Sequence, residues 1–163
     1  MINAQEGSTA PMRRTLRAGI AAILIASSGG ALAQTTSDYA VVDGVTIYYA
    51  VLPAEMLRNY PPGSEEGRMH GGVPSGRHVH HLQIALFDAT TGARITDASV
   101  VATVTETGLG GVARALEPFQ IGEALTYGGY FQFDTRDLYD IRVRATLPDD
   151  GRQIERTFEY RHQ

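Results

Sequence analysis

From residue 38 onward the sequence consists of short runs of alternating apolar and polar residues, separated at close spacing by turn residues. Such runs are typical of half-buried β-strands, and their spacing favours a sandwich or barrel over a helical fold. Asp43-Gly44 lies between two of these runs and predicts a two-residue hairpin. Residues 148–151, Pro-Asp-Asp-Gly, predict a second hairpin. We therefore expect an all-β fold, an immunoglobulin-like antiparallel β-sandwich of about eight strands.

The individual runs can be placed along the chain by their turn residues. The expected strands cover residues 39–42, 45–51, 78–88, 99–105, 112–116, 125–133, 139–147 and 153–160. A short helical segment is expected after Pro53, and the strand at 112–116 is expected to end at Glu117-Pro118. Gly128-Gly129 interrupts an otherwise strand-like run, which predicts a bulge or a close approach of another group to the backbone.

The amino end carries an export signal ahead of the strand-rich part. Arg13 and Arg14 precede the apolar run 18–26, and small residues with an A-x-A cleavage pattern follow it. We expect residues 1–33 to be a cleaved signal peptide and residues 34–163 to form a single domain in the periplasm. Adjacent arginines are common in ordinary signal peptides, so we expect the general secretory route rather than the twin-arginine route. The run is too short to span a bilayer, and we expect no membrane span in the mature chain.

Charge and cysteine content exclude several classes of function. All 14 basic residues are arginine, they are scattered along the chain, and the formal net charge is -4. Phosphate binding needs a clustered basic face, so we expect no nucleic-acid partner. The chain contains no cysteine. Disulfides, zinc–thiolate sites, iron–sulfur clusters and cysteine nucleophiles are therefore excluded.

Histidines concentrate around one long connection, residues 60–77, which is rich in Gly, Pro and Ser. Loops of this length are usually functional or disordered. In an extended strand, His78 and His80 project from the same face about 6.6 Å apart, near enough to share one ion. Imidazole binds copper, zinc or iron, and a thioether favours Cu(I). The sequence predicts a site for copper or iron with the ligands His70, His78, His80, His81 and Met69. The alternative is that these histidines are solvated or are satisfied core residues.

Catalytic residues are harder to find. Ser75 is near His78 and His80 in the sequence, but no G-x-S-x-G elbow surrounds it and no orienting acid can be named. No base–nucleophile pair is evident. We expect that the protein is not an enzyme.

Between His80 and Leu147 the order of short motifs resembles the periplasmic iron-transport-associated family. The matching pieces are His80-His81-Leu82, Thr91-Gly92-Ala93, Asp97-Ala98, Leu116-Glu117-Pro118, Tyr127-Gly128 and the closing strand from Tyr139. The resemblance implies a small immunoglobulin-like protein that binds copper and assists ferrous iron uptake. In that family a Met follows the Leu-x-Pro and a His precedes the Tyr-Gly, both as copper ligands. Here these positions are Phe119 and Thr126, so the resemblance implies a ligand role only at His80-His81.

Two functions remain open from the sequence. The first is a periplasmic metal-binding protein that handles copper or iron as a carrier or as an accessory to an inner-membrane transporter. The second is a non-catalytic interaction module whose long loop and edge strands hold another envelope protein. Immunoglobulin-like sandwiches host both kinds of function, so the fold alone does not choose between them.

Overall fold

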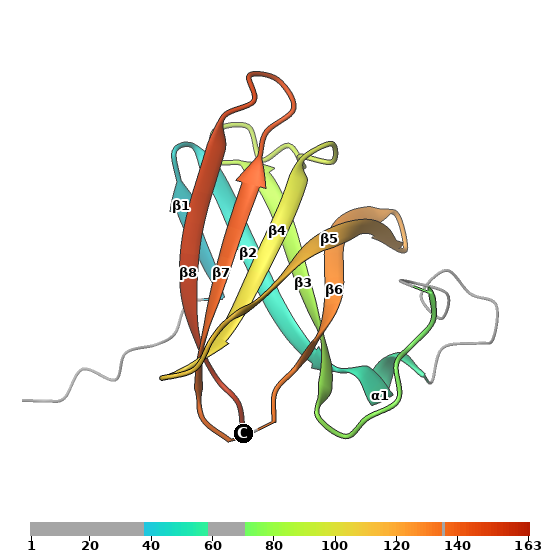
Figure 1. The fold of residues 1–163 in the computed structure, drawn as a ribbon. Coiled ribbons are helices and arrows are strands. Elements are labelled where there is room, and N and C mark those ends of the chain that lie inside the picture. Colours follow the sequence, from blue (N-terminus) through green and yellow to red (C-terminus); the bar gives the residue numbers. More distant parts are fainter. Residues whose placement is uncertain (1–37, 59–70, 135) are drawn as a thin grey trace, which may run out of the picture. The chain divides into compact units, whose positions relative to one another are not determined.

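A computed structural model describes residues 38–58, 71–134 and 136–163 (Figure 1). The predicted signal peptide lies outside these ranges, and so do two predicted ligands, Met69 and His70. Within the described ranges no helix is long and apolar enough to cross a membrane.

The described chain consists almost entirely of strands. A single helical turn, α1 (Ala54–Leu57), follows the second strand. The strands are β1 (Tyr39–Val42), β2 (Val45–Pro53), β3 (Val79–Asp88), β4 (Ser99–Glu106), β5 (Val112–Ile121), β6 (Ala124–Gln132), β7 (Leu138–Thr146) and β8 (Gln153–Arg161). The expected all-β, eight-stranded architecture is confirmed.

The strands follow one another in space in the order β1-β2-β3-β6-β5-β4-β7-β8, and each pairing is antiparallel. β5 joins the two layers of the sandwich. Its first half pairs with β4 and its second half with β6, and Figure 1 shows it crossing between them.

The expectation that the fifth strand ends at Glu117-Pro118 is wrong, because β5 continues to Ile121. Leu116 is the last residue of β5 that pairs with β4, and Glu117 is the first that pairs with β6. Proline cannot donate a ladder hydrogen bond and is tolerated where regular pairing is interrupted. Pro118 therefore marks the change of sheet and not the end of the strand.

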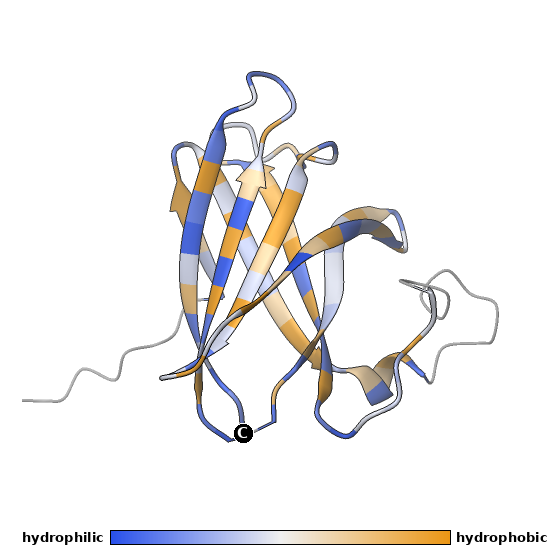
Figure 2. Ribbon diagram, in the orientation of Figure 1, coloured by the Kyte–Doolittle hydropathy of each residue, from blue (hydrophilic) through white to orange (hydrophobic). Residues whose placement is uncertain are grey.

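The core lies between the two layers and follows the alternation of the sequence. In β7, for example, Tyr139, Ile141, Val143 and Ala145 are buried while the residues between them are exposed. Figure 2 shows the same alternation of hydrophobic and hydrophilic residues along β7 and β8. Each large side chain buried in this way stabilises the fold by about 1.5–3 kcal/mol. The chain has no cysteine, so no disulfide supplements this packing.

Both predicted hairpins are present. Asp43 and Gly44 have φ angles of 46° and 80° between β1 and β2. Two consecutive positive φ values are the signature of a type I′ turn, whose twist matches that of the strands. Residues 148–151 connect β7 to β8, and the Gly151 N–H donates to the Leu147 carbonyl at 3.2 Å.

Candidate functional site

β3 places two of the predicted ligands on opposite faces of its sheet. His80 shares a face with the core residues Leu82 and Ile84, whereas His81 projects from the other side. His78 precedes the strand and is exposed. The described histidines of the predicted cluster therefore occupy two separate environments.

His81 fills a niche on the outer face of β3, β5 and β6. Its side chain is completely buried, with its ring centroid 5.1 Å from that of Phe119 and 4.9 Å from that of Tyr130. Gly128 forms the floor, because a Cβ there would lie 2.6 Å from Nε2 of His81 and 2.5 Å from Cε1 of Phe119. The close approach predicted at the Gly-Gly pair is confirmed, and regular pairing with β3 rules out a bulge at that point. This histidine thus has the surroundings of a core side chain.

The same niche gathers the positions at which the resemblance implies copper ligands. Phe119 lies beside the His81 ring, and Thr126 is the direct partner of Phe119 in the β5–β6 ladder. A phenyl ring offers no lone pair, and a hydroxyl oxygen is a hard ligand that suits copper poorly. Of the three positions, only His81 carries a nitrogen donor. The residues of the niche do not fit a copper centre.

His80 lies on the other side of the sheet, at the end where β3 begins. It is only 6% exposed, and its Nδ1 lies 3.1 Å from the His78 carbonyl oxygen. A carbonyl oxygen can only accept, so we assign the ring proton to Nδ1 and the lone pair of the neutral ring to Nε2. Burial lowers the pKa of His80, which favours this neutral form. Metal-bound histidines are commonly oriented by such a hydrogen bond from the other ring nitrogen.

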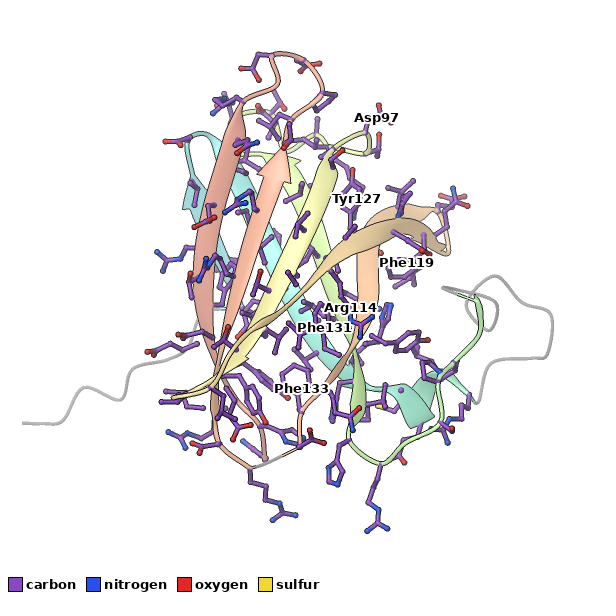
Figure 3. The ribbon with its side chains drawn as sticks, in the orientation of Figure 1. Asp97, Arg114, Phe119, Tyr127, Phe131 and Phe133 are labelled. Carbon is purple, nitrogen blue, oxygen red and sulfur yellow. The ribbon has the colours of Figure 1, made fainter. Side chains whose placement is uncertain are left out.

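A histidine that the sequence analysis did not single out lies beside His80. The His162 ring centroid is 4.7 Å from that of His80, and the planes are at 84°. His162 follows β8, and its backbone N–H donates to the Asp137 carbonyl at 3.0 Å. Both imidazoles lie against Phe133, with centroids at 5.3 and 5.8 Å. Figure 3 shows Phe133 at the end of the sandwich opposite Asp97, and well apart from Phe119.

Among residues 38–58, 71–134 and 136–163, no group of three or more His, Cys, Asp or Glu side chains is placed to hold a metal ion. The described members of the predicted ligand set, His78, His80 and His81, therefore do not form such a group. Met69 and His70 lie outside the described residues. What the described part does offer is a pair of imidazoles, His80 and His162, in contact. Imidazole nitrogens fit Cu(II), Zn(II) and Ni(II).

Comparisons of the sequence with known proteins are uninformative. No known family model matches the chain, and no curated protein sequence matches it.

Comparison of the structure with solved structures is informative about the fold. A copper-bound variant of FetP from uropathogenic Escherichia coli has a TM-score of 0.61 at 11% identity, covering 78% of this chain and 95% of its own. Copper-reconstituted P19 from Campylobacter jejuni has a TM-score of 0.58 at 10% identity, covering 78% of this chain and 94% of its own. A DUF4426 family protein from Pseudomonas aeruginosa has a TM-score of 0.56 at 12% identity, with coverages of 77% and 94%. At these identities the likeness shows that the chain has the fold of these proteins, as the resemblance in the sequence implied.

Proposed function

We propose that this protein binds a transition-metal ion, copper above all, through the histidines at the end of the sandwich where β3 begins. The observation that carries the proposal is the arrangement of His80: a buried imidazole whose Nδ1 lies 3.1 Å from the His78 carbonyl oxygen, to which we assign it as donor. This leaves Nε2 as the nitrogen that can bind a metal.

The similar structures support copper as the ion, since two of those reported above contain it. His78, Met69 and His70 remain proposed ligands, because the long connection that leads into β3 carries all three. We assign His81 to packing instead, because its niche supplies no second nitrogen or sulfur donor at the positions of Phe119 and Thr126.

The proposed location is the periplasm. The signal-like amino end supports it. A related solved FetP was expressed recombinantly in the E. coli periplasm. There the protein would act without catalysis, as a metal carrier or as an accessory to an inner-membrane transporter of copper or iron.

A second function, the envelope interaction module, is favoured by a different surface. Tyr39 is 50% exposed, Val41 58% and Tyr48 43%, all on β1 and β2 at one edge of the sheet. The Tyr39 and Tyr48 rings stack at a centroid distance of 5.3 Å, and the Phe87 ring meets Tyr48 edge-on at 5.6 Å. Exposed apolar surface of this kind is common at protein contacts.

The test compares two histidines that are adjacent in the sequence but lie on opposite faces. Purified, untagged protein is titrated with Cu(II), Zn(II) and, by competition with a chromogenic chelator, Cu(I). We expect His80→Gln to weaken binding and His81→Gln to leave the affinity unchanged. Wild-type protein that binds none of the three ions would overturn the proposal. Loss of binding only in His81→Gln would move the site to the outer niche.

A further inference from the structure

We propose that His162 is a metal ligand and forms with His80 a two-imidazole site that bridges the two layers of the sandwich. The inference rests on the proposed function and names a residue that neither the histidine-rich loop nor the resemblance includes. Its basis is the contact of the two rings, whose centroids are 4.7 Å apart. Two nitrogens that each lie about 2 Å from one ion require a separation of this order between the rings.

Contacts within the fold position both histidines beside each other. The His78 carbonyl fixes His80 through Nδ1, at 3.1 Å. The backbone N–H of His162 is bonded to the Asp137 carbonyl, and its ring lies 6.4 Å from that of Tyr160 at an interplanar angle of 30°. Ligands held in this way lose little conformational freedom when they bind. The pair should therefore bind a metal ion at a smaller entropic cost than two histidines on mobile surface segments.

Aromatic side chains surround the pair on the core side. The rings of Phe133 and Tyr139 border His162, with centroids 5.8 and 6.5 Å from that of the imidazole. A site of two imidazole nitrogens, with water completing the coordination, suits Cu(II) or Zn(II) better than Cu(I). The pair therefore favours Cu(II) over Cu(I).

A metal ion bound by this pair would connect the two layers of the sandwich. His80 belongs to β3 in one layer, whereas His162 follows β8 in the other. One ion held by both would tie the layers together at this end. Because a ligand that binds only the folded state stabilises it, Zn(II) should raise the melting temperature of the wild-type protein.

The experiment replaces His162 with Gln and uses Arg161→Gln as the matched control, an exposed neighbour that leaves both imidazoles in place. Cu(II) and Zn(II) are titrated separately into untagged protein. We expect His162→Gln to lower the affinity by about tenfold or more, since even residues that only orient a ligand are worth about 10- to 100-fold. The control should bind like the wild type. Circular dichroism of each variant verifies folding.

Electron paramagnetic resonance of the Cu(II)-loaded protein gives a second readout that does not depend on affinity. Nitrogen couplings should report two imidazoles in the wild type and one in His162→Gln. The rise in melting temperature with Zn(II) should disappear in the same variant. Unchanged affinity and unchanged nitrogen count would overturn the role of His162 and leave the proposed function standing. A wild type that binds no metal would overturn both.

Discussion

Gly128→Ala tests the packing that we assign to His81. The added Cβ would lie 2.5 Å from Cε1 of Phe119 and 2.6 Å from both Cε1 and Nε2 of His81. Inserting a methyl group into a filled site costs about 1–3 kcal/mol. Replacing Gly by Ala restores about 0.4–1 kcal/mol through the unfolded chain. The expected net loss in the free energy of unfolding lies between about 0 and 2.6 kcal/mol, and is about 1.3 kcal/mol from the middle of each range.

Urea denaturation followed by circular dichroism measures this loss, since the chain has no tryptophan to report by fluorescence. With a slope of about 2 kcal/mol per M, the midpoint should fall by about 0.5–1 M. Gly129→Ala is the matched control, because the nearest neighbour of its Cβ would be the end of the flexible Leu116 side chain, at 3.1 Å, and Phe131 would lie at 3.9 Å. A Gly128→Ala variant as stable as that control would refute the packing described for His81.

Three further variants probe other contacts. Tyr127→Phe removes a hydroxyl that accepts from one backbone N–H at 2.9 Å and donates to one carbonyl at 3.3 Å before β4, so urea denaturation should show a loss of about 1–3 kcal/mol. Asp88→Asn should make the stability of the fold less sensitive to acid. Hydrogen bonds from Thr91 lower the pKa of Asp88 in the folded state. The carboxylate therefore stabilises the fold fully above the ordinary carboxyl pKa of about 4, and this stabilisation is lost as the pH falls through the lower folded pKa. Equal acid sensitivity in thermal melts of wild type and variant would contradict this. Phe119→Met combined with Thr126→His should create Cu(I) binding in the niche, detected by chelator competition; no gain over wild type would show that these positions do not converge on a metal.

Much of the fold was predictable because strands and turns follow local rules. Alternation with a period of two residues identified the strands, and Asp43-Gly44 identified the first hairpin because its backbone has to adopt positive φ angles. The course of β5 was not predictable in this way. Pro118 is compatible with the end of a strand and also with a change of sheet, and only the pairing of the second half with β6 decides between them.

The candidate site was less accessible from the sequence, because it depends on contacts between distant segments. His162 carries no local signal, and only the antiparallel order of the sheet brings the end of β8 beside the start of β3. The separation of His80 from His81 could have been inferred, since neighbouring residues of a strand face opposite sides. The Gly128-Gly129 pair predicts a close approach from the sequence alone, but its partner, His81, follows only from the three-dimensional contacts.

The central claim is that a metal ion binds at the end of the sandwich where β3 begins. Anomalous diffraction at the copper edge, from crystals of the protein soaked in a copper salt, tests it most directly because it locates the ion without any variant. The account predicts a peak about 2 Å from Nε2 of His80, on the side that faces His162. A peak in the niche of His81, or no peak beside His80 in crystals that contain copper elsewhere, would contradict it.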